Sequence, residues 1–336
     1  MRVRYHGPIS RGLCGARGRG PAGATWQTDR VSPEPLLRIA GLTKRYGAVT
    51  ALDGLDAEVP SGRTGVVGAN GAGKTTLFRI LLGLARPTSG SVEVAGVSVA
   101  ADPIAVRSRL GYMPEHDCLP LDQTAADVVA TFGELSGLPP RAARRRASEV
   151  LDLVGLDEAR FRPIGGFSTG MRQRAKLAQA LVGGPEVVLL DEPTAGLDPA
   201  GREEMLALVA RLGSFGISVL MSTHLLDDVQ RVCDHVLMLD AGRLVVSGPT
   251  GSLLAGTGSV TVDVGHGQAA DRLAAELTRR GLEADVVDGL VKAAVDGEGQ
   301  LDVVRDAIAD LDLPLFRLGS GLVTLDEVFL ARVGPR

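Results

Sequence analysis

The sequence predicts an α/β fold with a buried parallel sheet, followed by a smaller α+β domain. Three observations support this prediction. A glycine-rich loop at residues 68–75 lies between a short apolar strand and a segment with helical spacing. The apolar run at 187–190 has the composition of a strand that is buried on both faces of a parallel sheet. Beyond about residue 256, short strand and helix patterns follow one another in a different order.

The glycine-rich loop has the sequence G-A-N-G-A-G-K-T, which matches the phosphate-binding pattern G-x-x-x-x-G-K-[ST]. Val66 and Val67 lead into it as a strand, and residues 76–84 follow with apolar side chains at helical spacing, the last being Leu84. Glycines let the backbone wrap closely enough to point N–H groups at phosphate oxygens. The N-terminus of the following helix adds partial positive charge.

We therefore predict a nucleotide site in this loop. Lys74 is expected to reach the β- and γ-phosphates, and the Thr75 hydroxyl is expected to bind Mg²⁺. The residues assigned to nucleotide binding here are Gly68, Asn70, Gly71, Ala72, Gly73, Lys74, Thr75 and Thr76.

The amino-acid composition limits the classes of function that the protein can have. With 336 residues, 45% of them hydrophobic, the chain has room for one large or two medium domains. Its net charge of −4 argues against a protein that coats nucleic acid. The three cysteines are scattered without a C-x-x-C pair, so we expect neither a disulfide framework nor a zinc site. The four lysines among the many arginines are Lys44, Lys74, Lys176 and Lys292.

No segment has the roughly 18 consecutive apolar residues that predict a membrane-spanning helix. If the protein acts at a membrane, we expect another chain to supply the spans. Residues 1–35 form an arginine- and glycine-rich segment without apolar periodicity, which predicts a disordered basic leader. A solvated tail is favoured over a segment that contacts RNA or anionic lipid, and the natural start of the chain is suspected to lie downstream of Met1.

Two strands are predicted before the glycine-rich loop. The segments 36–47 and 51–59 carry apolar residues in strand-like patterns and are joined by a polar turn. Tyr46 is expected in the intervening loop, where a purine base could stack on its ring. The alternative for Tyr46 is a half-buried core residue.

The chain from about 115 to 182 is predicted to be largely helical. Its segments 125–135, 141–154 and 171–181 show apolar residues three and four positions apart. Ser168 precedes the last of these segments and is well placed as an N-cap. Its hydroxyl, the flexible Gly170 and the free N–H groups of the helix indicate a second anion site.

Two acidic residues follow the apolar strand predicted at 187–190. Ligands of open α/β sheets gather at the carboxyl ends of the strands. Asp191 is therefore assigned to Mg²⁺, and Glu192 is assigned to orient or deprotonate an attacking water. A loop is expected at 195–199.

A further buried strand is predicted at 217–221. His224 follows it, again at the carboxyl end of a strand, where it is expected to contact a γ-phosphate. The segments 234–239 and 243–247 predict a hairpin around Asp240–Gly242.

The C-terminal part, residues 256–336, is predicted to be a separate accessory domain. Its patterns follow the order strand, helix, strand, strand, helix, strand, which suggests a ferredoxin-like unit. Residues 324–330 are expected to form a closing helix. We find no catalytic group there, so a structural or dimer-supporting role is favoured over a ligand sensor.

Taken together, these motifs in residues 36–255 resemble the ATP-binding subunit of ABC transporters. By this resemblance, Tyr46 is the aromatic residue that stacks on adenine, and residues 68–76 are the Walker A loop. Glu115 occupies the Q-loop position, beside the Mg²⁺ and the reacting phosphate. The remaining positions are the signature motif at 167–171, the Walker B pair Asp191 and Glu192, the D-loop residue Asp198, and the switch histidine His224.

Three motifs depart from the family pattern. Glu115 replaces the usual Gln and adds a negative charge near the Mg²⁺. The signature retains Ser168 and Gly170, while its other three positions differ from L-S-G-G-Q. Ala69 replaces the usual Pro, which we expect to be harmless. The segments F-S-T-G-M-R-Q-R and Y-M-P-E resemble the drug-resistance and antibiotic-exporter branch.

The resemblance implies a head-to-tail dimer that encloses two ATP molecules. Ser168 and Gly170 would then serve the ATP held by the other subunit. The expected function is an ATPase that powers a separate transmembrane permease from the cytoplasmic face of the membrane, exporting a drug, an antibiotic or another hydrophobic compound. No nucleic-acid partner is expected. The alternatives are a soluble ABC-type ATPase that acts on ribosomes or DNA, and a permease-bound regulatory subunit with poor hydrolysis.

Overall fold

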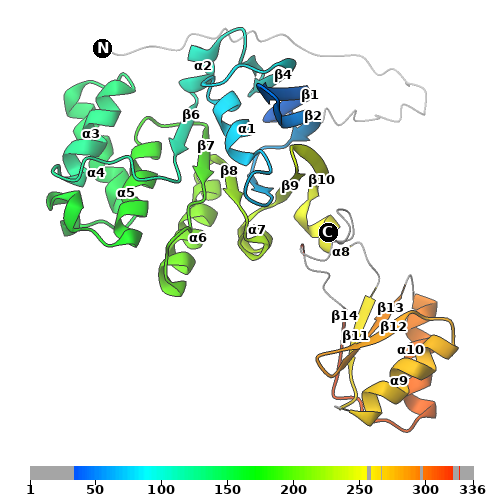
Figure 1. The fold of residues 1–336 in the computed structure, drawn as a ribbon. Helices are drawn as coiled ribbons and strands as arrows, with labels where there is room; N and C mark the ends of the chain where they lie inside the picture. Colours follow the sequence, from blue (N-terminus) through cyan, green and yellow to red (C-terminus); the bar gives the residue numbers. More distant parts are fainter. Residues whose placement is uncertain (1–33, 256–258, 266, 296–297, 321–324, 326–336) are drawn as a thin grey trace, which may run out of the picture. The chain divides into compact units, whose positions relative to one another are not determined.

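The computed structural model describes residues 34–255, 259–265, 267–295, 298–320 and 325. Three sheets and their helices make up this part of the chain (Figure 1). Within it, no helix is long and apolar enough to cross a membrane. The predicted leader, residues 1–35, falls almost wholly outside the described residues.

The central sheet has six strands in the order β10-β9-β3-β8-β7-β6. Its pairs are parallel except for the edge hairpin β9–β10. All five residues of β7 and all six of β8 are buried, as the apolar runs predict. The strand bounds are β3 Arg63–Val67, β6 Leu110–Met113, β7 Val187–Asp191, β8 Ser218–Thr223, β9 His235–Asp240 and β10 Arg243–Pro249.

A smaller antiparallel sheet precedes and flanks the glycine-rich loop. Its order is β2-β1-β4-β5, with bounds β1 Leu37–Tyr46, β2 Val49–Val59, β4 Ser89–Val94 and β5 Val97–Ser98. The predicted pair of strands before the loop is therefore confirmed. Tyr46 was expected in the connecting loop and is instead the last residue of β1, paired with Val49.

The helix after the glycine-rich loop is α1, Lys74–Leu81. It begins two residues earlier and ends three residues earlier than the spacing predicts. Leu84 was expected on its apolar face, but it lies beyond the helix and is 68% exposed. The chain turns at Gly83, whose φ of +67° is left-handed and ends the helix. The short helices α2 Pro103–Arg107 and α7 Leu226–Val232 were not predicted.

The predicted helical segments are present with small shifts of their ends. They are α3 Ala125–Leu135, α4 Pro140–Leu153 and α5 Thr169–Leu181, with short 3-10 turns at Glu158–Phe161 and Ile164–Gly166. Figure 1 shows these helices together beside the edge of the sheet that carries β6. The loop expected at 195–199 ends in α6, Pro199–Ser214, and α8, Thr250–Ala255, follows the hairpin.

The C-terminal elements have the predicted order. They are β11 Ser259–Asp263, α9 Gln268–Arg279, β12 Ala284–Val287, β13 Leu290–Ala294, α10 Glu298–Asp310 and β14 Arg317–Ser320. The sheet order is β12-β13-β11-β14, and all three strand pairs are antiparallel. This is the arrangement of a split β-α-β unit. Of the closing helix predicted at 324–330, only Leu325 is described; it is helical and fully buried.

Candidate active site

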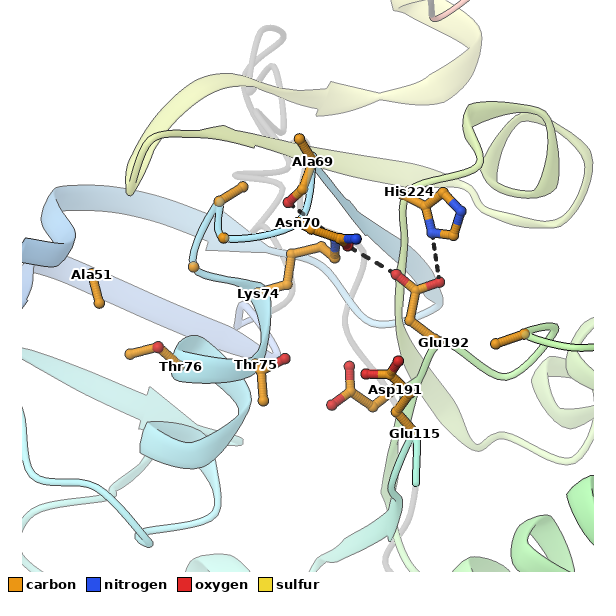
Figure 2. Close-up of a pocket in the computed structure, with 14 residues that line it drawn as sticks. Ala51, Ala69, Asn70, Lys74, Thr75, Thr76, Glu115, Asp191, Glu192 and His224 are labelled. Atoms are coloured by element: carbon orange, nitrogen blue, oxygen red, sulfur yellow. Dashed lines mark hydrogen bonds and ion pairs between the residues drawn. The ribbon is translucent and has the colours of Figure 1, made fainter. Parts of the chain in front are cut away.

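A cavity of about 240 Å³ lies where the glycine-rich loop faces the carboxyl ends of β6, β7 and β8 (Figure 2). The parallel sheet brings these strand ends to one edge, as expected for an open α/β sheet. The lining residues are Ala51, Ala69, Asn70, Gly71, Ala72, Gly73, Lys74, Thr75, Thr76, Glu115, Asp191, Glu192, Ala195 and His224.

Two glycines give the loop its path. A Cβ on Gly68 would lie 2.3 Å from the carbonyl oxygen of Leu239, so no side chain fits between the loop and β9. Gly73 has φ +106°, and a Cβ there would lie 2.7 Å from the carbonyl oxygen of Ala51. Gly73 precedes α1 as its N-cap, and in the part of the chain that the structure describes no side chain caps that helix. The first N–H groups of α1 are therefore available as hydrogen-bond donors to a phosphate group.

Lys74 is 7% exposed, and its ammonium group points back along the loop. The Nζ atom donates to the carbonyl oxygens of Gly68, at 2.6 Å, and Ala69, at 3.4 Å. It also lies 3.6 Å from Oε1 of Glu192. A buried ammonium needs such partners, and they hold the cation where phosphates would enter.

Glu192 lies between two of the predicted site residues. Figure 2 shows its carboxylate between Lys74 and His224, whose Nδ1 is 3.0 Å from Oε2 of Glu192. The backbone of Glu192 has φ +48°, an unusual conformation for a residue with a side chain. Its N–H donates to the carbonyl oxygen of Ser222 at 3.1 Å. Strain of this kind is typical of functional sites that the surrounding structure holds in place.

Asp191 ends β7 and is held by two residues that the sequence analysis did not identify. The hydroxyl of Ser222, at the end of β8, donates to Oδ1 at 2.5 Å. The hydroxyl of Tyr112, on β6, donates to Oδ2 at 3.4 Å. Burial and the charge of Asp191 raise the pKa of Tyr112 to about 12, so its hydroxyl stays a donor. Neither contact follows from the sequence patterns, because both depend on the order of strands in the sheet.

The oxygen-rich lining suits Mg²⁺. Thr75, Asp191 and Glu115 all line the cavity and offer one hydroxyl and two carboxylates. Mg²⁺ prefers oxygen ligands and completes its shell with phosphate oxygens and water. Among the described residues, no group of three or more His, Cys, Asp or Glu side chains could hold a metal ion alone. The donor set therefore fits Mg²⁺ that arrives with a nucleotide.

The second set of predicted residues does not line this cavity. Ser168 caps α5 by accepting from the N–H of Met171 at 3.3 Å, and Asp198 caps α6 by accepting from the N–H of Gly201 at 3.1 Å. Both capping residues are exposed, and Gly170 is half-buried. The predicted N-cap at Ser168 is therefore confirmed. The structure does not bring these residues to the phosphate loop of the same chain.

Tyr46 also lies outside the cavity lining. It is 45% exposed at the end of β1, and the ammonium of Lys44 lies 4.7 Å from the centre of its ring. The ring is therefore partly exposed at the surface, where a base could stack on it. The Lys44 ammonium group already makes a cation–π contact with the same ring.

Comparison with known proteins supports the nucleotide site. Residues 52–195 match the family model described as ABC transporter. A daunorubicin resistance ATP-binding protein of Streptomyces coeruleorubidus is 38% identical, over 89% of this chain and 96% of its own length. A methionine import ATP-binding protein of Streptomyces coelicolor is 37% identical, over 80% of this chain and 86% of its own length.

The fold also matches solved structures of ABC transporter components. The structure of cbiO1 from Clostridium perfringens, described as part of an ABC transporter complex, has a TM-score of 0.61 and 26% identity. The match covers 74% of this chain and 98% of that one. The phosphate loop, the carboxylates at the ends of the strands and these relatives agree: the chain belongs to the ATP-binding ATPases of ABC transporters.

Proposed function

We propose that the cavity is the site of ATP hydrolysis and that Glu192 is its catalytic base. The observation that carries this proposal is the position of Glu192, buried between Lys74 and His224 at the mouth of the phosphate loop. Phosphoryl transfer depends mainly on positioning and on neutralising charge. A carboxylate fixed beside the phosphate site can orient a water molecule and accept its proton.

Lys74 and His224 have complementary roles in this proposal. Lys74 exchanges its contact with Glu192 for the β- and γ-phosphates, which frees the carboxylate for water. His224 keeps its hydrogen bond to Glu192 and faces the γ-phosphate, so that it fixes the orientation of the base. The uncapped start of α1 adds N–H donors for the phosphate oxygens.

Thr75, Asp191 and Glu115 would hold Mg²⁺, and Ser222 and Tyr112 orient Asp191 for that purpose. When it is bound, Mg²⁺ supplies positive charge to the β- and γ-phosphate oxygens. Tyr46 stacks on the adenine ring from β1. Because Glu115 is a carboxylate where the family usually has an amide, this chain contributes an additional negative charge toward the metal.

The residues outside the cavity support a dimer. Ser168 and Gly170 lie at an exposed helix N-terminus, and exposed Asp198 lies at another. In a head-to-tail dimer, they would contact the γ-phosphate of the ATP that the partner's glycine-rich loop holds. ATP would then draw two copies together, and hydrolysis would release them.

We further propose that this ATPase powers a separate transmembrane permease from the cytoplasmic face of the membrane, and that it exports a drug, an antibiotic or another hydrophobic compound. The support is the daunorubicin resistance relative, which matches along almost the whole chain. The methionine import relative covers less of this chain, so a transport assay must decide the direction.

The test of the catalytic assignment is Glu192→Gln. The amide keeps the size of the side chain but cannot accept a proton, so steady-state ATP turnover should fall by about 100-fold or more. Equilibrium binding of ATP should remain. The matched control is Glu149→Gln on the exposed face of α4, which should hydrolyse ATP at the wild-type rate. Wild-type turnover in Glu192→Gln would refute the assignment.

The partner is tested by affinity purification of the Glu192→Gln form from detergent-solubilised membranes in the presence of ATP. Recovery of one stoichiometric protein with several membrane spans, identified by mass spectrometry, is the expected result. Recovery with ribosomal proteins or nucleic acid from the soluble fraction would overturn the permease proposal in favour of the soluble ATPase.

A further inference from the structure

Lys176 is a buried lysine whose role the function above does not explain. It lies in α5 and is 1% exposed. Its Nζ atom donates to three successive carbonyl oxygens: those of Pro114 and Glu115, both at 2.8 Å, and that of His116, at 3.4 Å. The three N–H donors of an ammonium group thus match three acceptors on one stretch of backbone.

The stretch that Lys176 holds is the one that carries Glu115. It follows β6 directly, and the side chain of Glu115 lines the nucleotide cavity, although the residue is otherwise exposed. A short exposed loop without such an anchor would sample many conformations. A second cation of α5, Arg172, lies 3.9 Å from Asp117 and reaches the same loop. Two side chains one helical turn apart therefore bind the loop to α5.

A buried lysine is costly unless its hydrogen bonds are satisfied. An apolar residue would fill the same space in α5 without that cost. The hydrogen bonds that satisfy Lys176 all go to the backbone around Glu115, which indicates that the lysine positions this loop.

We propose that Lys176 is a positioning residue, which fixes the backbone of residues 114–116 to α5 so that the Glu115 carboxylate faces Thr75 and Asp191 for Mg²⁺–ATP. This inference rests on the proposed function of the cavity and deepens it. Ser168 caps the same helix, so one rigid element carries both the cap proposed to serve the partner's ATP and the anchor of Glu115.

The experiment measures equilibrium binding of ATP by calorimetry at increasing Mg²⁺ concentration, with full-length protein in the Glu192→Gln background, where hydrolysis does not interfere. Lys176→Met removes all three donors and keeps the length of the side chain. Loss of a residue that orients a metal ligand typically weakens metal affinity about 10- to 100-fold. We expect the Mg²⁺ concentration for half-maximal ATP binding to rise by at least about tenfold.

The matched control is Arg160→Met. Arg160 is also a buried cation of the helical part, and it donates to backbone carbonyl oxygens of Ser148, at 3.1 Å, and Asp157, at 2.5 Å. It is absent from the cavity lining. Its loss should lower the melting temperature but leave the Mg²⁺ dependence unchanged. If Lys176→Met behaves in the same way, its role is only structural and the proposal is overturned.

A double-mutant cycle tests whether Lys176 acts through Glu115. In a Glu115→Ala background, Lys176→Met should produce little further change in the Mg²⁺ dependence. Full additivity of the two effects would overturn the proposal. If Lys176→Met does not fold, Lys176→Gln replaces it, because this variant keeps two N–H donors on a shorter side chain. It should shift the Mg²⁺ dependence in the same direction by a smaller amount. An unchanged Mg²⁺ dependence in Lys176→Gln would overturn the proposal. Failure of the parent protein to bind ATP at all would instead refute the function proposed for the cavity.

Discussion

Apart from Tyr46, the residues assigned to ATP fall into two regions that differ in how their polar groups are satisfied. In the cavity, Glu192 contacts both Lys74 and His224, and Asp191 is held by neighbouring strands. At the N-termini of α5 and α6, Ser168 and Asp198 bond only their own helices in the described part of the chain, and both are exposed.

This difference shows what each region is built to do. Lys74, Asp191 and Glu192 are buried, and Lys74 already balances the charge of Glu192, so a nucleotide must replace the contact between these two residues. The helix caps lie at the surface, where positive helix ends face solvent. They can receive a phosphate from another molecule without rearranging a core. The first region supports chemistry, and the second supports association.

The largest expected effect that separates the two regions comes from Ser168→Ala. Loss of the cap should cost about 1 kcal/mol of stability. ATP-dependent dimerisation of the Glu192→Gln form should weaken by at least about tenfold, because a hydrogen bond to a charged phosphate contributes about 1.5–3 kcal/mol. Sedimentation velocity with and without ATP measures the dimer.

Thr124→Ala is the matched control, because Thr124 caps α3 in the same way, accepting from the N–H of Asp127 at 3.1 Å. It should lose a similar amount of stability and dimerise normally. Equal dimerisation of both variants would show that Ser168 is only a cap, and the contrast between the two regions would disappear.

A smaller effect is expected inside the cavity region, from the two groups that hold Asp191. Ser222→Ala should lower the free energy of unfolding by about 1–3 kcal/mol, since it removes a donor from a buried carboxylate. Tyr112→Phe should cost less than about 0.5 kcal/mol, because its bond to Asp191 is long. Urea denaturation of both variants measures the difference. A larger loss for Tyr112→Phe would reverse the assigned order of the two partners.

The smallest effect concerns pH and lies outside both regions. Burial lowers the pKa of His235, a 7% exposed residue of β9 whose Nδ1 has no hydrogen-bond partner among the described residues. Below about pH 6.5, the ordinary pKa of histidine, His235 binds a proton in the unfolded state but not in the folded state. The free energy of unfolding therefore falls as the pH drops toward the lower pKa of the folded state.

His235→Gln removes the side chain that takes up this proton on unfolding. The decrease in melting temperature between pH 7.5 and pH 5.5 should therefore be smaller in the variant than in the wild type. An identical decrease would show that burial of His235 does not contribute to the acid sensitivity of the ATPase fold.

The local motifs were readable in the sequence because each depends on a few adjacent residues. The phosphate loop, the buried strand before Asp191 and the N-cap at Ser168 follow from glycine conformation, apolar runs and capping chemistry. The same local signals predicted the order of the C-terminal elements. They were less precise at helix ends: Leu84 continued the apolar spacing, although the chain had already turned at Gly83.

Only the tertiary structure decided which residues meet. The contacts of Ser222 and Tyr112 with Asp191 depend on the order of strands in the sheet, and the bond from Lys176 to the loop of Glu115 joins residues about 60 positions apart. The φ of +48° at Glu192 depends on the neighbouring strand that accepts its N–H. Sequence patterns record the preferences of short segments, whereas these contacts arise from packing between segments, which no local pattern encodes.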